Sequence, residues 1–254
     1  MPAPAVALRT RRLVRDFRGF RAVDQVDLDV ADGSVHALVG PNGAGKTTLF
    51  NLLTGFLAPT SGRVELRGHD ITGLPPEKIA QRGVARSFQI TSLFPQLTAR
   101  EHVELALQRE DGLGWKFWRS ANLTRRYTDR AMALLAGVGL ESLAESSADS
   151  LPYGRKRALE LALALALEPT VLLLDEPTAG MGMEDIDSTV ELISRVRQGR
   201  TVVMVEHNMS VVGRLADTVT VLQAGRVLVE GPYHQVRDDS RVIAAYLGSA
   251  NAAH

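Results

Sequence analysis

The most regular feature of the chain is a set of short apolar runs that end in glycine or in an acidic residue. The three runs span residues 35–39, 171–174 and 201–205. A strand in a parallel sheet is covered on both faces, so it reads as a nearly continuous apolar run. Segments with apolar residues at helical spacing lie between the runs, and strands that alternate with helices predict an α/β fold.

Other stretches alternate between apolar and polar residues, which is typical of strands with one exposed face. Residues 9–34 predict two strands around a turn, and residues 219–222 and 226–230 predict a hairpin around Ala224-Gly225. The other elements predicted before residue 90 are a strand over 63–66, a loop over 67–76, a brief helix over 78–83 and a strand over 84–89.

Residues 98–168 have helical periodicity instead. Thr98 and Glu101 have the spacing of a capping box, in which each side chain accepts a hydrogen bond from the other residue's backbone amide. Helices are predicted over residues 101–109 and 125–137, and a long Ala/Leu helix is predicted after residues 151–157, ending at Leu167. Near the end of the chain, the pattern predicts one helical segment over 233–247 and a frayed tail over 248–254.

Both tryptophans of the chain, Trp115 and Trp118, lie between the first two helices of this region. One interpretation is a buried turn between the helices. The other is an exposed apolar patch that binds a partner, since tryptophan is enriched at interfaces. The sequence leaves both open.

A glycine-rich stretch follows the first apolar run and fits the phosphate-binding template G-x-x-x-x-G-K-[ST] at every fixed position. Strand, loop and helix follow one another here, as the template requires. Glycines allow the loop to turn its amides toward phosphates at the positive end of a helix. A plain glycine turn beside a core helix is the alternative. The residues predicted to bind nucleotide here are Gly40, Pro41, Asn42, Gly43, Ala44, Gly45, Lys46, Thr47 and Thr48.

Within this stretch, Lys46 can reach the β- and γ-phosphates, and Thr47 offers a hydroxyl to Mg²⁺. Two acidic residues, Asp175 and Glu176, come directly after the second apolar run, residues 171–174. Ligands bind at this end of the strands in open α/β sheets. We therefore expect Asp175 to hold Mg²⁺ through water and Glu176 to deprotonate the attacking water; simple capping of the next helix is the alternative.

Three further residues are candidates because of where they stand. His207 follows the third apolar run and is expected at the same edge, as a phosphate contact. Gln89 ends the strand predicted over 84–89 and matters if that end points at the phosphate loop. Phe17 either packs on a small sheet or stacks on a nucleotide base.

The composition is that of an ordinary globular protein of 254 residues. Lys plus Arg and Asp plus Glu both number 29, so no strong overall charge favours nucleic acid. The chain has no cysteine, and its start lacks the pattern of a signal peptide. The most apolar stretch, residues 158–167, is shorter than the roughly 20 residues that span a bilayer. If the protein acts at a membrane, we therefore expect it to do so through a partner.

Taken in order, these motifs resemble the nucleotide-binding subunit of ABC transporters over essentially the whole chain. The order is Phe17, the phosphate loop, Gln89 as the Q-loop, a signature at residues 151–155, Asp175-Glu176 and His207 as the switch histidine. The resemblance implies a P-loop NTPase (RecA-like) core with an antiparallel β subdomain and an inserted α-helical subdomain.

In residue numbers, the resemblance implies a single ABC ATPase domain over 1–254. Its core with the β subdomain is 1–89 and 169–230, its helical subdomain is 90–168, and its C-terminal helix and tail are 231–254. The resemblance also implies that Lys46, Gln89, Glu176 and His207 act in catalysis, that Thr47, Gln89 and Asp175 hold Mg²⁺, and that Tyr153 and Gly154 contact ATP bound by a second subunit.

Within this family, the chain is similar to the ATPases of branched-chain and related hydrophobic amino-acid importers. The stretches that carry this similarity are 53–56, 85–89, the tryptophan-containing insertion, Tyr153-Gly154, 179–182 and 245–248. The similarity implies ATP and Mg²⁺ as ligands, transmembrane permease subunits and a second ABC ATPase subunit as partners, and indirectly a periplasmic or extracellular solute-binding protein. It places the chain at the cytoplasmic face of the cell membrane, held there by the permease.

Four positions depart from the family pattern. Pro152 and Tyr153 stand where the signature has serine and glycine, Gly182 stands where aspartate is frequent, and Leu163 replaces a frequent arginine. Pro152 has neither a hydroxyl nor a backbone N–H. These departures favour a heterodimer in which this signature serves the weaker site. An exporter cassette for lipid or lipopolysaccharide and a soluble ABC ATPase are the alternative functions; the second usually has two cassettes, a zinc motif or a coiled-coil insertion.

Overall fold

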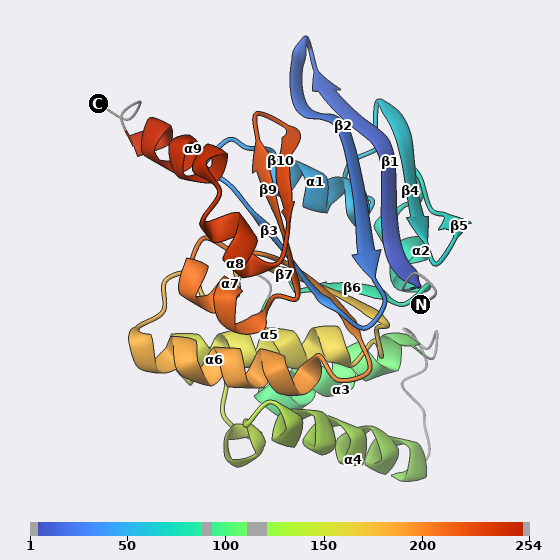
Figure 1. The fold of residues 1–254 in the computed structure, drawn as a ribbon. Coiled ribbons are helices and arrows are strands. Elements are labelled where there is room, and N and C mark those ends of the chain that lie inside the picture. The colour runs from blue at the N-terminus through green and yellow to red at the C-terminus, as the bar shows by residue number, and fades with distance from the viewer. Residues whose placement is uncertain (1–4, 88–92, 111–120, 251–254) are drawn as a thin grey trace.

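The computed structural model describes residues 5–87, 93–110 and 121–250. Gln89 and the two tryptophans, Trp115 and Trp118, lie outside these residues. The chain forms a mixed α/β structure with two sheets, so the predicted fold class is confirmed (Figure 1).

The larger sheet holds the apolar runs at its centre. Its strand order is β10-β9-β3-β8-β7-β6, and every neighbouring pair is parallel except β9 and β10, which form the predicted hairpin. The strands are β3 (Val35–Val39), β6 (Val84–Ser87), β7 (Val171–Asp175), β8 (Thr201–Val205), β9 (Thr218–Gln223) and β10 (Arg226–Gly231).

The smaller sheet is antiparallel, with the order β2-β1-β4-β5. Its two long strands are the pair predicted over residues 9–34. They are longer than predicted at the N-terminal end, because the first strand pairs from Val6 onward. The strands are β1 (Val6–Phe17), β2 (Phe20–Ala31), β4 (Ser61–Leu66) and β5 (His69–Asp70).

Helices complete the layers. Those on the side of the small sheet are α1 (Lys46–Leu53) and α2 (Pro76–Ala80). The others are α3 (Ala99–Glu110), α4 (Ala121–Gly137), α5 (Tyr153–Leu165), α6 (Met183–Val196), α7 (Met209–Leu215), α8 (Tyr233–Arg237) and α9 (Ser240–Ala250), with 3-10 turns at Glu141–Leu143 and Ala148–Ser150. In Figure 1, α3 to α6 lie below the parallel sheet and the small sheet lies above it.

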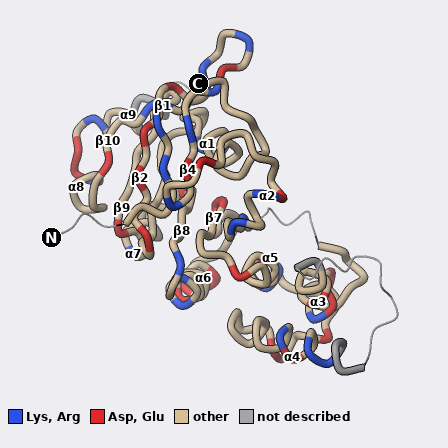
Figure 2. Tube along the Cα trace, turned by 90° about the vertical axis from the view of Figure 1, so that its right-hand side faces the viewer, with Lys and Arg blue, Asp and Glu red and all other residues tan. Residues whose placement is uncertain are grey.

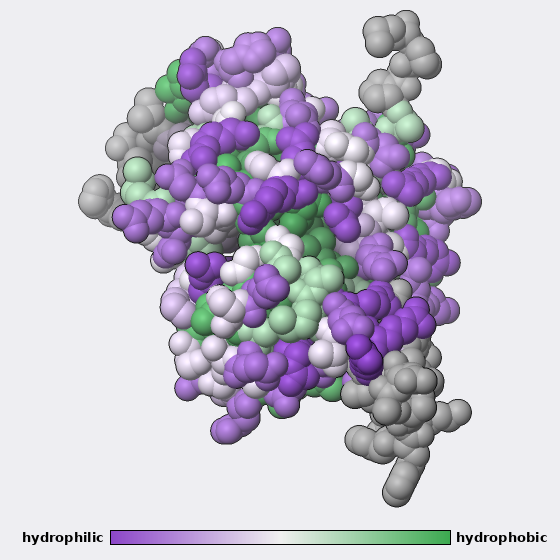
Figure 3. Space-filling view, turned by 90° about the horizontal axis from the view of Figure 1, so that it is seen from below, coloured by the Kyte–Doolittle hydropathy of each residue, from purple (hydrophilic) through white to green (hydrophobic). Residues whose placement is uncertain are grey.

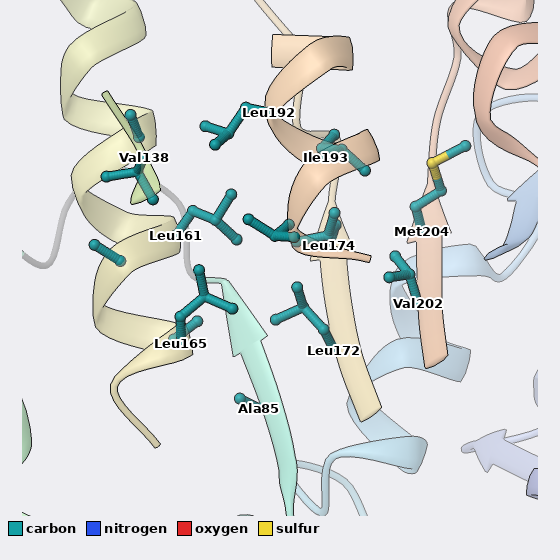
Figure 4. Packing of buried hydrophobic residues seen from close by; sticks show 14 of the residues in the cluster. Ala85, Val138, Leu161, Leu165, Leu172, Leu174, Leu192, Ile193, Val202 and Met204 are labelled. Atoms are coloured by element: carbon teal, nitrogen blue, oxygen red, sulfur yellow. The ribbon is translucent and has the colours of Figure 1, made fainter. Parts of the chain in front are cut away.

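The parallel sheet is buried on both faces because it separates two hydrophobic cores. Alternate residues of one strand enter different cores: Leu172 and Leu174 of β7 pack toward the helices α5 and α6, and Val171 and Leu173 pack toward α1 and the small sheet. Figure 4 shows Leu172 and Leu174 facing Leu161 on α5. Burial on both sides fixes the register of the strand, because a shift by one residue would exchange its two faces.

The predicted capping box at the start of α3 is confirmed. The backbone amide of Glu101 donates to Thr98 Oγ1 at 3.1 Å, and the amide of Thr98 donates to Glu101 Oε2 at 2.8 Å. The helix therefore begins at the residue that follows the cap, as this motif requires.

Four of the predictions are wrong. The brief helix spans Pro76–Ala80 rather than 78–83, because proline suits the first turn of a helix. The loop predicted before it contains the short strand β5. The terminal helix is two helices, since the Asp239 carboxylate accepts a hydrogen bond from the Arg241 amide at 2.8 Å and starts α9 anew. This second helix continues to Ala250, into the predicted tail.

Basic and acidic residues are scattered among other residues along the described trace (Figure 2). From below, the helical side shows a largely hydrophilic surface with one apolar area near its centre (Figure 3). Within the described ranges, each helix is too short or too polar to cross a bilayer.

The buried carboxylate of Glu160 makes the stability of the fold depend on pH. Glu160 on α5 is 5 % exposed, and burial raises its pKa from 4.5 to about 7, against the opposing effect of Arg157. Between these two values, the folded state keeps a proton that the unfolded chain has released. The free energy of unfolding therefore falls as the pH rises through this range, by on the order of 3 kcal/mol.

The Glu160→Gln variant has no ionisable group at this position, so it should not lose free energy of unfolding as the pH rises through this range. We expect the variant to gain stability over the wild type as the pH rises from about 4.5 to about 7, and the gain to level off above that. Urea unfolding of both proteins across this pH range measures the difference. A difference that stays constant with pH would contradict the assignment to Glu160.

Candidate nucleotide site

The parallel sheet brings three predicted segments to one edge. Leu38 of β3 pairs with Val205 of β8, and Val205 pairs with Asp175 of β7. The three strands run in the same direction, so the segments after them leave the sheet at the same edge. The glycine loop follows β3, Glu176 follows β7, and His207 lies two residues beyond β8.

The glycine loop packs against two neighbouring backbones at distances that only glycine allows. A Cβ atom on Gly40 would lie 2.2 Å from the carbonyl oxygen of Leu222, and one on Gly45 would lie 2.3 Å from that of Ala22. Both residues also have a positive φ, +147° and +100°. The loop is thus held between β9 and β2, and α1 begins directly after Gly45.

Lys46 lies across this loop. Its Nζ donates to the carbonyl oxygens of Gly40 at 2.7 Å and Pro41 at 3.0 Å, and the residue is 6 % exposed. Burial lowers the pKa of the ammonium group, and the nearby carboxylate of Glu176 opposes this. The lysine at the start of α1 and the glutamate directly after β7 therefore interact electrostatically.

Glu176 and His207 meet at the sheet edge. His207 Nε2 lies 2.8 Å from Glu176 Oε1. The Glu176 side chain is 32 % exposed and the His207 side chain 40 %, so both are accessible from solvent. Glu176 has φ +47°, a left-handed conformation that is costly for a residue with a side chain. Such conformations concentrate at functional sites.

The Asp175 carboxylate forms an ion pair with Arg86. Arg86 Nη2 donates to Asp175 Oδ2 at 2.5 Å, and its Nη1 donates to Asn51 Oδ1 at 2.7 Å. The guanidinium also lies over the rings of Phe50 and Phe56, at 5.6 and 5.9 Å from their centroids. This arginine therefore links β6, α1 and the acidic strand end.

Phe17 lies at the turn between β1 and β2 and is 40 % exposed. The guanidinium of Arg15 lies 4.6 Å from its ring centroid. The same hairpin passes the phosphate loop, since Gly45 approaches Ala22 of β2. The aromatic ring and the loop therefore belong to one part of the structure.

The signature residues lie elsewhere, at the start of α5. Pro152 occupies the cap position of this helix. The Tyr153 hydroxyl donates to the carbonyl oxygen of Ala179 at 2.9 Å, and a Cβ on Gly154 would lie 3.2 Å from Asp185 Oδ1. Within the described part of the chain, these contacts are with the segment after β7 and not with the phosphate loop.

Comparisons with known proteins agree with this geometry. The family model described as ABC transporter matches residues 23–179, more than half of the chain. The chain belongs to the ABC transporter family. A second model, described as branched-chain amino acid ATP-binding cassette transporter, matches residues 226–252 of this ABC cassette.

One relative and two solved structures are especially informative. The high-affinity branched-chain amino acid transport ATP-binding protein BraF of Pseudomonas aeruginosa is 40% identical, over 96% of this chain and 98% of its own. The ADP conformation of MJ1267, an ATP-binding cassette of an ABC transporter, is 28% identical with a TM-score of 0.85, over 96% and 99% of the two chains. The dimeric structure of MJ0796, a bacterial ABC transporter cassette, is 25% identical with a TM-score of 0.75, over 89% and 98%.

The residues present at the edge suit a nucleotide and Mg²⁺. The loop is open at Gly43, where an added Cβ atom would have no other atom within 4 Å, and the buried ammonium of Lys46 lies beside this loop. Thr47 is exposed at the start of α1. Its hydroxyl and the carboxylate of Asp175, whose Oδ2 is paired with Arg86, are oxygen ligands, which Mg²⁺ prefers.

Sequence reasoning missed two residues of this edge. Arg86 stands out in the sequence only as part of a stretch similar to amino-acid importers, and Glu206 only as the end of a strand. The spacing along the chain gives no signal for their contacts, since Arg86 and Asp175 are 89 residues apart. The position of Glu206 directly before His207 is the one hint that the sequence contains.

Substitution of Gly45 tests the close packing of the loop. Gly45→Ala must displace the carbonyl of Ala22, whereas Gly68→Ala has the same kind of positive φ, +81°, with nothing within 4 Å. Both variants carry the conformational cost of about 1–2 kcal/mol, but only the first deforms the loop. We expect Gly45→Ala to weaken ATP binding at least about tenfold, or about 1.4 kcal/mol, and Gly68→Ala to leave it unchanged. Titration with a fluorescent ATP analogue measures this; equal affinities would contradict the role of the close packing.

Proposed function

We propose that this ABC cassette hydrolyses ATP to drive the import of branched-chain or related hydrophobic amino acids. The observation that carries the ATPase proposal is the meeting of the phosphate loop, Glu176 and His207 at one edge of the sheet. The similarity to BraF over nearly the full length of both chains supports the transported class, as does the match of residues 226–252.

The phosphate loop binds the triphosphate in this proposal. The loop amides and the start of α1 attract the negatively charged triphosphate, because the amino end of a helix is positive. Lys46 exchanges its bonds to Gly40 and Pro41 for the β- and γ-phosphates, and Phe17 stacks on the base. Mg²⁺, when bound, neutralises charge between these phosphates; Thr47, Asp175 and Gln89 would hold it.

Glu176 acts as the general base. Its carboxylate accepts the proton of the water that attacks the γ-phosphate. His207 is 2.8 Å from this carboxylate, so it can orient Glu176 and contact the γ-phosphate. Lys46 stabilises the charge that develops on the transferred group.

A second cassette completes the site. We propose that Tyr153 and Gly154 of one subunit face the ATP bound to the loop of another, since in their own chain they contact residues after β7. ATP would then favour the closed pair, and hydrolysis would reopen it. The dimeric structure of the MJ0796 cassette supports an arrangement of this kind.

The remaining partners are permease subunits in the membrane and, through them, a solute-binding protein outside the cell. The cassette then lies at the cytoplasmic face of the membrane. In the same proposal, residues 1–89 and 169–230 are the nucleotide-binding core, 90–168 the helical subdomain and 231–254 the C-terminal segment.

A heterodimer is favoured over a homodimer. Pro152 caps α5 without a side-chain hydrogen bond, and Gly182 caps α6 in the same way. A serine or an aspartate at these positions would add a polar group to the contact with the second subunit. The partner cassette would then supply the stronger signature.

The transported class is tested in proteoliposomes that contain the cassette with its permease and partner subunits. We expect a solute-binding protein loaded with leucine to stimulate ATP hydrolysis and to drive uptake. Stimulation by a lipid substrate instead, with none by branched-chain amino acids, would replace the importer by an exporter.

Glu176→Gln tests the catalytic role. The amide cannot accept the proton, so we expect turnover to fall at least about a hundredfold, the lower end of general-base contributions, with ATP binding retained. Without hydrolysis the ATP-bound pair should also persist on a sizing column with MgATP. Glu184→Gln, in the first turn of α6, is the control and should hydrolyse normally. A Glu176→Gln protein that turns over near the wild-type rate would remove Glu176 from this role.

Pro152→Ser tests the proposed weakness of the signature. A hydroxyl bonded to a charged phosphate contributes about 1.5–3 kcal/mol, or roughly tenfold or more in rate if the bond forms in the transition state. The isolated chain should therefore be a slow ATPase that Pro152→Ser accelerates. Steady-state phosphate release at saturating MgATP compares the two, and equal rates would remove the main support for an unequal heterodimer.

A further inference from the structure

The buried carboxylate of Glu206 joins the two segments that carry Glu176 and His207. Glu206 directly follows β8 and is 2 % exposed. Its Oε1 accepts hydrogen bonds from the backbone amide of Thr178 at 3.1 Å and from the Thr178 hydroxyl at 2.5 Å. Its Oε2 accepts from the amides of His207 at 2.9 Å and Asn208 at 3.1 Å. The side chain is thus a cross-link between the turn after β7 and the start of α7.

The chemistry of this cross-link requires a carboxylate. A buried charge is tolerated only where hydrogen bonds replace its water, and each oxygen of Glu206 receives two donors. Three of the four donors are backbone amides, whose positions the fold fixes. A carboxamide would place its own NH₂ group against two of these donors, on whichever side it turned.

Both ends of the cross-link hold catalytic side chains. On one side, Thr178 belongs to the turn in which the Ala179 amide donates to the Glu176 carbonyl oxygen at 3.1 Å. Glu176 has a strained φ of +47°, and such a conformation persists only when surrounding contacts hold it. On the other side, the His207 amide is itself one of the donors.

We propose that Glu206 is a positioning residue for hydrolysis, which holds the backbones of Glu176 and His207 so that their side chains meet. The proposal rests on the ATPase function proposed above. The phosphate loop lies between β3 and α1, and the four donors to the Glu206 carboxylate lie outside it. Loss of the cross-link should therefore slow hydrolysis while the affinity for ATP is kept.

The test compares kcat and KM of the purified full chain for three variants. Glu206→Gln disrupts the cross-link, and Thr178→Val removes only its hydroxyl donor. Thr10→Val is the matched control, because it removes a buried hydroxyl that donates to the Val26 carbonyl oxygen at 2.9 Å in the other sheet. We expect kcat to fall about tenfold or more for Glu206→Gln, the size of effect that misplaced catalytic groups produce, and less for Thr178→Val. KM should change by no more than about twofold, well below the tenfold change in affinity that about 1.4 kcal/mol produces. Thr10→Val should keep the wild-type kcat.

A double variant separates positioning from general loss of stability. If Glu206 and Thr178 act as one unit, the loss in kcat for Thr178→Val with Glu206→Gln should be smaller than the product of the single losses. Multiplicative losses, an unchanged kcat in Glu206→Gln, or an equal loss in Thr10→Val would each overturn the proposal. If Glu206→Gln does not fold, Thr178→Val against Thr10→Val decides by the same criterion.

Hydrogen exchange gives a readout that needs no turnover. In Glu206→Gln, the amides of Thr178, His207 and Asn208 should exchange faster than in the wild type, and unchanged exchange would overturn the cross-link itself. A wild-type chain that neither binds nor hydrolyses ATP would refute the proposed function. A wild-type chain that hydrolyses ATP beside an equally active Glu206→Gln would refute only the role of Glu206.

Discussion

The parallel pairing of β3, β8 and β7 is the constraint on which the site depends. The hydrogen-bonded register sets Leu38, Val205 and Asp175 side by side, so the segments after these strands leave the sheet together. The cores on the two faces keep the register, because alternate residues of each strand are buried on opposite sides. Loop, carboxylates and histidine converge for this reason, although Lys46 and His207 are far apart in the chain.

Several residues at this edge have a strained backbone or are tightly packed against neighbouring backbones. Glycines allow the loop to approach the backbones of Ala22 and Leu222, and Glu176 adopts a left-handed conformation. A series of contacts leads from this glutamate to the helical layer, since the Tyr153 hydroxyl of α5 bonds the Ala179 carbonyl within the same turn. A displacement of α5 would therefore move the turn that contains Ala179, whose amide bonds the Glu176 carbonyl oxygen.

The sequence predicted those features that depend on local patterns. The apolar runs, the glycine loop and the capping box at Thr98 are each written in a few consecutive residues, and the structure contains the strands, the loop between β3 and α1 and the cap. Contacts across the chain gave no such pattern. The ion pair of Arg86 with Asp175 and the cross-link of Glu206 with Thr178 join residues 89 and 28 positions apart. The break at Asp239 was missed, although aspartate is a preferred residue directly before the start of a helix.

The proposed function depends on the binding of MgATP by the phosphate loop at this edge of the sheet. A crystal structure of the chain with Mg²⁺ and a non-hydrolysable ATP analogue tests it most directly. We predict the phosphates against the amides of the loop, Lys46 released from Gly40 and Pro41 to the β- and γ-phosphates, and the metal beside the Thr47 hydroxyl. A nucleotide bound elsewhere, or Lys46 still bonded to the loop carbonyls beside a bound triphosphate, would contradict it.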